Sequence, residues 1–128
     1  MATPKPVVVG WYEIPVSDME RAIAFYESVF DTELTRNQMG VLDMAWFPFS
    51  EKGVGASGSL VHHAEFYQPS DSGSLLYFSS EDVDQELSRV EGAGGTILNR
   101  KTEISPDVGF MALFLDSEGN RIALHSRK

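Results

Sequence analysis

Apolar positions follow two different periods in the first part of the chain. Residues 7–16 are rich in β-branched and aromatic side chains, which predicts a strand. From Ser17 to Phe30, apolar residues recur at steps of three and four, which predicts a helix with one buried face. Ser17 and Glu20 have the spacing of a capping box, so we expect Ser17 to begin the helix. The apolar stripe consists of Met19, Ala22, Ile23, Tyr26, Val29 and Phe30.

The turn-forming pair Met39-Gly40 and the alternation at Phe47 and Phe49 predict further strands in the first half of the chain. We expect them at residues 33–38, 42–49 and 59–63. The intervening segment 51–58 contains three glycines and is expected to be a loop. Residues 68–73 form a dense cluster of turn-forming residues, where we place a boundary between two halves.

The second half repeats the order of the first. A strand is expected at 75–79, a helix at 82–91, a strand beginning at 96–98, a loop over 99–109, and a hairpin of strands 110–115 and 121–126. The segment Val16-Ser17-Asp18-Met19-Glu20-Arg21-Ala22-Ile23 is echoed by Ser80-Glu81-Asp82-Val83-Asp84-Gln85-Glu86-Leu87, at an offset of 64 in a chain of 128 residues. Each half therefore reads strand-helix-strand-strand-strand. We expect one domain, 1–128, built from modules at 7–67 and 74–128.

Composition and charge exclude several classes of protein. The apolar fraction of 42% and the 8 Phe, 4 Tyr and 2 Trp are sufficient for a packed core. The formal net charge of −9 disfavours nucleic acid and anionic membranes as partners. The chain has no cysteine, which excludes disulfides and thiolate chemistry. We see no membrane-spanning apolar run and no hydrophobic signal region, so a cytoplasmic location is expected.

Four motifs, in their order and spacing, resemble the vicinal oxygen chelate superfamily of glyoxalase I, extradiol dioxygenases and bleomycin-resistance proteins. They are Glu-Ile-Pro-Val-Ser-Asp-Met-Glu-Arg-Ala-Ile-Ala-Phe-Tyr at 13–26, Glu-Asp-Val-Asp at 81–84, Gly-Ala-Gly-Gly at 92–95 and Asp-Ser-Glu-Gly-Asn-Arg-Ile at 116–122. The chain is similar to a small branch of predicted enzymes related to lactoylglutathione lyase. The resemblance implies an α+β fold of two tandem βαβββ modules, with a cupped eight-stranded mixed sheet around a cavity. It also implies a homodimer.

The resemblance further implies where a divalent ion would bind. Metal-dependent members hold the ion with His, Glu or Gln at four strand positions, which correspond here to Trp11, Ser59, Leu75 and Ala123. None of these four is an ordinary ligand for such an ion. We therefore expect no metal and no other cofactor. A displaced ion held by Glu13, His63 and His125 is the alternative left open.

Alternation along the strands predicts which side chains line the cavity with those four positions. The expected ligand-binding residues are Trp11, Glu13, Ser59, His63, Leu75, Tyr77, Arg121, Ala123 and His125. Trp11 is either a stacking platform or part of the core, and Tyr77 either bonds a ligand through its hydroxyl or packs in the core. An aromatic floor with a few ionisable groups is typical of a small-molecule pocket.

Three functions remain open from the sequence. The first is metal-independent binding of a small-molecule ligand. The second is a lyase or isomerase in which Glu13 and His125 move a proton, with or without a displaced metal ion. The third is an interaction domain with an occluded cavity.

Overall fold

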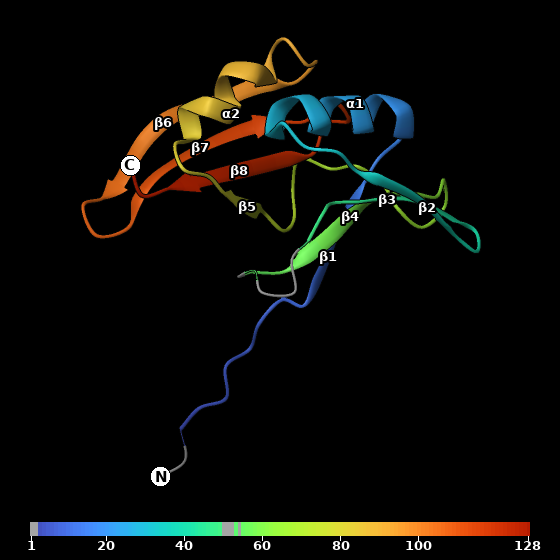
Figure 1. The fold of residues 1–128 in the computed structure, drawn as a ribbon, viewed down its shortest axis with the longest axis horizontal. Helices are drawn as coiled ribbons and strands as arrows, with labels where there is room; N and C mark the ends of the chain where they lie inside the picture. Colours follow the sequence, from blue (N-terminus) through green and yellow to red (C-terminus); the bar gives the residue numbers. More distant parts are fainter. Residues whose placement is uncertain (1–2, 50–52, 54) are drawn as a thin grey trace.

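The computed structural model describes residues 3–49, 53 and 55–128. Two helices lie on one side of two sheets that stand side by side, and the N-terminal arm extends away from the body (Figure 1). In chain order, the elements are β1 (Trp11–Pro15), α1 (Met19–Phe30), β2 (Thr35–Met39), β3 (Leu42–Trp46), β4 (Ser57–His62), β5 (Leu76–Ser79), α2 (Val83–Val90), β6 (Thr96–Ser105), β7 (Gly109–Leu115) and β8 (Arg121–Ser126).

The α+β class and the two βαβββ modules are confirmed. The eight strands, however, form two four-stranded mixed sheets and not one continuous sheet. The first sheet has the order β1-β4-β3-β2 and the second has the order β5-β8-β7-β6. Among the described residues, β1 pairs only with β4, and β5 pairs only with β8. Each sheet therefore ends in a free edge at the first strand of its module, and a single chain does not close the expected cup.

Helix α1 begins one residue later than the capping-box spacing predicts. Asp18 is the N-cap, and its side chain accepts a hydrogen bond from the backbone N–H of Arg21 at 3.1 Å. The carboxylate of Glu20 instead accepts a hydrogen bond from Arg36 at 2.9 Å, so it is not available to complete a capping box. Of the predicted stripe, Met19, Ala22, Tyr26 and Val29 are buried, and Phe25 joins them.

One core joins the two modules. Phe25 of α1 packs against Phe114 of β7, and Phe78 of β5 packs against Tyr12 of β1 with ring centroids 5.6 Å apart. Burial raises the pKa of the Tyr12 hydroxyl to about 12. Because side chains from both modules fill this core, neither sheet buries its helix side alone.

The turn between β7 and β8 connects the second module to the start of α1. The buried carboxylate of Asp116 accepts a hydrogen bond from the hydroxyl of Tyr26 at 2.6 Å. Glu118 accepts hydrogen bonds from the backbone N–H groups of Ser17 and Asp18, at 2.9 and 2.8 Å, and forms an ion pair with Arg21 at 2.7 Å. Burial opposes ionisation of Glu118, but these hydrogen bonds outweigh it and lower its pKa to about 2.

Three predicted segments differ from the structure. Residues 7–10 do not join β1, and Val7 is 98% exposed, because no described strand lies beside them to accept their hydrogen bonds. Residues 99–105 belong to β6 and not to a loop, since that strand continues along β7 through three register shifts. The predicted loop at 51–58 lies partly outside the described residues, and its last two residues, Ser57 and Gly58, belong to β4 because they pair with β1.

No helix among the described residues is long and apolar enough to cross a membrane.

Candidate functional site

The first sheet has one face that no helix covers. On the opposite face, Ile14, Leu60 and Ala45 belong to the core under α1. Since successive side chains of a strand point to opposite sides, their neighbours face away from the helices. This helix-free face carries Trp11, Glu13, Met44, Trp46, Ser57, Ser59 and Val61.

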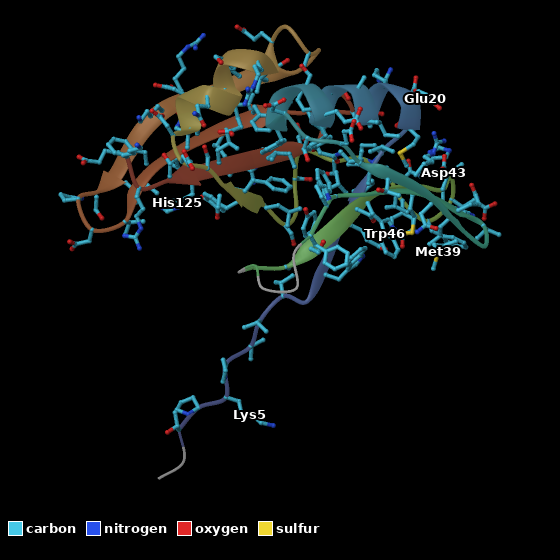
Figure 2. The ribbon with its side chains drawn as sticks, in the orientation of Figure 1. Lys5, Glu20, Met39, Asp43, Trp46 and His125 are labelled. Carbon is cyan, nitrogen blue, oxygen red and sulfur yellow. The ribbon has the colours of Figure 1, made fainter. Side chains whose placement is uncertain are left out.

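Two tryptophans meet across the helix-free face. Trp11 on β1 and Trp46 on β3 have ring centroids 5.3 Å apart and an interplanar angle of 71°, an edge-to-face contact. Strand β4 lies between β1 and β3, so the two indoles meet above the strand that carries the serines. Figure 2 shows Trp46 beside β3 and β4. Trp11 remains 40% exposed and forms the accessible part of the pair.

Three buried polar atoms on this face have no hydrogen-bond partner among the described residues. They are the Nε1 of Trp46 and the hydroxyl oxygens of Ser57 and Ser59, and all three are buried. Ser59 as a whole is 0% exposed. A buried donor without a partner costs about 1–3 kcal/mol, so native proteins rarely keep several together without a purpose.

A carboxylate stands beside the serines. Glu13 pairs with Ser59 across β1 and β4, and its Oε1 accepts a hydrogen bond from the hydroxyl of Tyr67 at 2.7 Å. The bond to Glu13 raises the pKa of the Tyr67 hydroxyl above its ordinary value. Tyr67 therefore stays protonated as a donor and holds Glu13 in place. The helix-free face thus combines stacking surfaces, hydroxyls and one oriented carboxylate.

Of the four positions at which a divalent ion would bind, only Ser59 carries a side-chain oxygen. Ser59 and Ala123 are fully buried on different sheets, Trp11 lies against Trp46, and Leu75 precedes β5. Indole, methyl and isobutyl groups offer no ligand atom to a hard or borderline dication. In the described part of the chain, no group of three His, Asp or Glu side chains is arranged to hold a metal ion.

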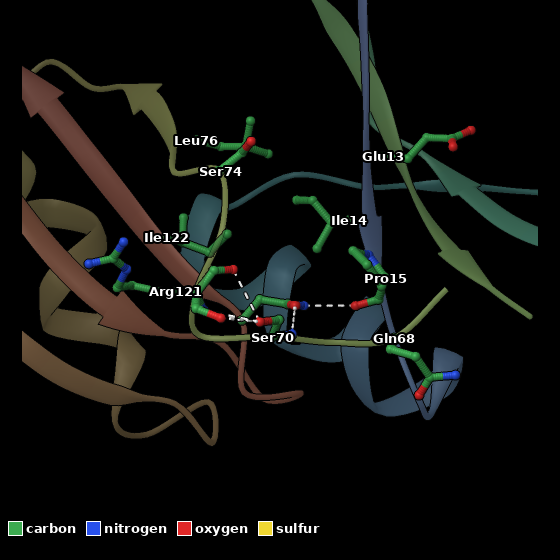
Figure 3. Close-up of a pocket in the computed structure, with 11 residues that line it drawn as sticks. Glu13, Ile14, Pro15, Gln68, Ser70, Ser74, Leu76, Arg121 and Ile122 are labelled. Carbon is green, nitrogen blue, oxygen red and sulfur yellow. Dashed lines mark hydrogen bonds between the residues drawn. The ribbon is translucent and has the colours of Figure 1, made fainter. Parts of the chain in front are cut away.

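A cavity of about 270 Å³ lies where the two modules adjoin (Figure 3). Ile14 and Leu76 line opposite sides. Asn120 also lines the cavity and donates a hydrogen bond from its side-chain amide to the carbonyl oxygen of Pro15 at 2.7 Å. Glu13 and Arg121 both border this cavity, but their side chains point away from each other (Figure 3). Glu13 and Arg121 therefore line the same cavity without forming an ion pair with each other.

The other predicted site residues lie apart from the helix-free face of the first sheet. Leu75 and Tyr77 line a separate cavity of about 400 Å³ beside the edge of β5. His63 follows β4 and stacks on Phe66 with ring centroids 4.5 Å apart. The Nε2 of His125 lies 2.6 Å from the carbonyl oxygen of Val108. Within one chain, Trp11, Glu13 and Ser59 share the first sheet, whereas His125 lies on the second.

The family profile matches nearly all of this fold. The Glyoxalase/Bleomycin resistance protein/Dioxygenase superfamily profile matches residues 8–124. The chain belongs to this superfamily. A glyoxylase-like domain-containing protein from Didymella fabae is 26% identical over 121 residues, which cover 93% of each chain.

Solved structures of superfamily members show the same fold. A domain from Frankia aligns with a TM-score of 0.72 and 20% identity, over 97% of this chain and all of its own. TnmS3, an antibiotic-binding protein from Streptomyces, aligns with a TM-score of 0.66 and 29% identity, over 98% of this chain and 100% of its own.

Trp46 and Tyr67 are two residues of the candidate site that the sequence patterns did not predict. Trp46 lies one position from Phe47, and Phe47 points into the core, so the alternation around Trp46 was available as a signal. Tyr67 lies after β4 in a segment without regular strand or helix structure, and its bond to Glu13 spans 54 positions of sequence. No local sequence pattern predicts a hydrogen bond over such a separation.

Proposed function

We propose that this protein binds a planar small molecule on the helix-free face of the first sheet and needs no metal ion to do so. The observation that carries the proposal is the set of buried polar atoms, without partners among the described residues, on the same face as two touching indoles. Aromatic walls with a few placed polar groups are the usual composition of a ligand site. The similarity to an antibiotic-binding protein, at 29% identity over nearly the whole chain, supports a binding role.

Intrinsic fluorescence tests this proposal directly. Trp11 and Trp46 are the only tryptophans in the chain, so the protein's tryptophan emission reports on this face alone. With naphthalene as probe, we expect a saturable change in emission and a raised melting temperature, both unaffected by EDTA. The variant Trp11→Ala should weaken both effects. Emission and melting that stay unchanged up to the solubility limit of naphthalene would contradict the proposal.

A second copy of the chain would supply a second sheet to this site. We propose a homodimer in which the helix-free face of the partner's second sheet completes the cup. The free edges of β1 and β5 and the exposed Val7, Val8 and Val9 support such an assembly. The side chains contributed by that sheet would be Leu75, Tyr77, Arg121, Ala123 and His125. Light scattering after gel filtration should give twice the chain mass of 14.2 kDa, and the single-chain mass would refute the dimer.

An enzymatic role is the second candidate. Only one oxygen of the Glu13 carboxylate accepts a hydrogen bond from the described residues, so the other is free to accept a proton from a ligand. The reaction would be a lyase or isomerase step related to that of lactoylglutathione lyase, with Glu13 and the partner's His125 as the acid/base pair. A glutathione hemithioacetal is a suitable assay substrate. Turnover that disappears in Glu13→Gln, in protein free of Ni, Zn, Mn and Fe by elemental analysis, would favour this role over simple binding.

The location of the protein stays a prediction. We propose the cytoplasm, which cell fractionation would test.

A further inference from the structure

The unpartnered atoms of the helix-free face specify more than a planar ligand. Trp46 Nε1 can only donate a hydrogen bond, and it is buried without an acceptor among the described residues. Ser59, directly opposite Trp46 on the neighbouring antiparallel strand, is also unpartnered and can donate through its hydroxyl. Two donors at paired positions of adjacent strands lie close enough to bond one small group.

The charge around these donors limits what that group can be. Glu13 flanks Ser59 on the other side, and the chain carries a net charge of −9. The helix-free side of β1, β4, β3 and β2 carries no lysine or arginine at its described positions. A carboxylate or phosphate at the Trp46 and Ser59 donors would face Glu13 with no cation from the same sheet beside it, so a neutral acceptor fits these donors.

We infer that the ligand is a planar aromatic molecule with a neutral hydrogen-bond acceptor on its ring system, a carbonyl or a ring nitrogen. The acceptor takes the N–H of Trp46 and the hydroxyl of Ser59, while the ring stacks on Trp11. Trp11 is the accessible member of the indole pair, so its side chain turns aside to admit the ligand. This inference rests on the proposed function, because it names the ligand class of the same site.

Matched probes separate the inference from the proposal on which it rests. Chromone has two fused rings and a ring carbonyl, naphthalene has two fused rings and no acceptor, and naphthalene-2-carboxylate adds a negative charge. By titration calorimetry we expect chromone to bind about tenfold more tightly than naphthalene, since one buried donor satisfied is worth about that factor. The carboxylate should bind more weakly than naphthalene.

The indole N–H resonances give a readout that a loss of packing would not reproduce. The chain has two tryptophans and therefore two such signals, which the variant Trp11→Phe assigns. Chromone should move the Trp46 N–H signal downfield, as a new hydrogen bond does, and naphthalene should not. Ser59→Ala and Trp46→Phe should lower the affinity for chromone to that for naphthalene. The control Trp11→Phe should weaken both probes by the same factor and keep their ratio.

Each of the other outcomes refutes a specific part of the inference or of the proposed function. Equal affinities for chromone and naphthalene would refute the neutral acceptor and leave the binding function intact. Tightest binding of the carboxylate would refute the charge argument. A ratio that survives both Ser59→Ala and Trp46→Phe, in variants that melt cooperatively, would show that buried water and not ligand satisfies these donors. If none of the three probes binds, the proposed function fails together with the inference.

Discussion

The two helix-free faces differ at the positions that the internal repeat brings into correspondence. In each module, the first strand pairs in parallel with the last, and the register of the pairs is equivalent. The first module has an indole, a carboxylate and a hydroxyl there, whereas the second has only one polar group: Trp11, Glu13 and Ser59 correspond to Leu75, Tyr77 and Ala123.

This difference separates what the fold requires from what the site requires. The core positions of both modules remain apolar, because both sheets bury their helix sides in one shared core. Only the helix-free faces are free to diverge. Tyr77 is 54% exposed and Ala123 has no polar side-chain atom to satisfy, whereas Ser59 is buried and lacks a partner among the described residues. The proposed binding chemistry is therefore concentrated on the first sheet.

The shared core gives the largest expected effect. Replacing the fully buried Phe114 of the second module by alanine should lower the free energy of unfolding by about 3–5 kcal/mol. Tryptophan fluorescence reports only on the first sheet, yet its urea midpoint should fall together with that of circular dichroism. Ile104→Ala, at a half-exposed position of β6, is the control and should change little. Separate midpoints would mean that the modules unfold independently.

The junction between the modules gives the next largest effect, and it depends on pH. Glu118→Gln removes a buried anion bonded to Arg21 and the start of α1, and should cost about 2 kcal/mol at neutral pH. The folded pKa of about 2 lies below the ordinary 4.5, so the contribution is complete above 4.5 and declines as the pH falls toward 2. Urea titrations of both proteins across this range should converge at low pH. A constant difference would exclude the ion pair as the cause.

Binding should distinguish the two faces more directly. Trp11→Ala removes a stacking surface and should weaken the binding of chromone about tenfold, as measured by titration calorimetry. Tyr77→Ala truncates an aromatic side chain on the helix-free face of the second sheet and should change the affinity less than about twofold, because Tyr77 lies at the rim of the proposed site. A large loss from Tyr77→Ala together with no loss from Trp11→Ala would place the ligand in the cavity beside β5.

The smallest expected effect is on stability, from removing a hydroxyl group in the first module or adding one at the corresponding position of the second. Ser59→Ala should leave the ligand-free protein as stable or about 1 kcal/mol more stable, since it removes an unpartnered hydroxyl. Ala123→Ser should destabilise it by about 1 kcal/mol, because it buries a new hydroxyl. Thermal unfolding of both variants measures the pair. A marked loss of stability in Ser59→Ala would show that the hydroxyl is structural.

Periodicity predicted the elements of the fold better than their pairing. The apolar stripe of the first helix and the hairpin at 110–126 follow from local pattern, and the structure confirms them. The start of α1 differed because Glu118, about a hundred positions away, occupies the backbone donors of Ser17 and Asp18. The division into two sheets is a relation between β1 and β5 that no local pattern contains.

The candidate site was partly predictable for the same reason. Trp11, Glu13 and Ser59 share a face because strand alternation and the repeat offset fix their positions. Tyr67 reaches Glu13 from an irregular segment after β4, which alternation does not describe. His125 was grouped with Glu13 on the assumption of one continuous cup, and the two side chains lie on different sheets. Local rules assign a side chain to a face, whereas the packing of modules decides which faces meet.

A crystal structure with 6-bromochromone tests whether the ligand binds on the helix-free face of the first sheet. Anomalous scattering from the bromine atom locates the ligand independently of how its ring is fitted to the electron density. We expect one strong peak per chain above the first sheet, with the ring against Trp11 and its carbonyl within hydrogen-bond distance of Trp46 Nε1. A peak confined to the cavity beside β5, with the two indoles still in contact, would contradict the proposal.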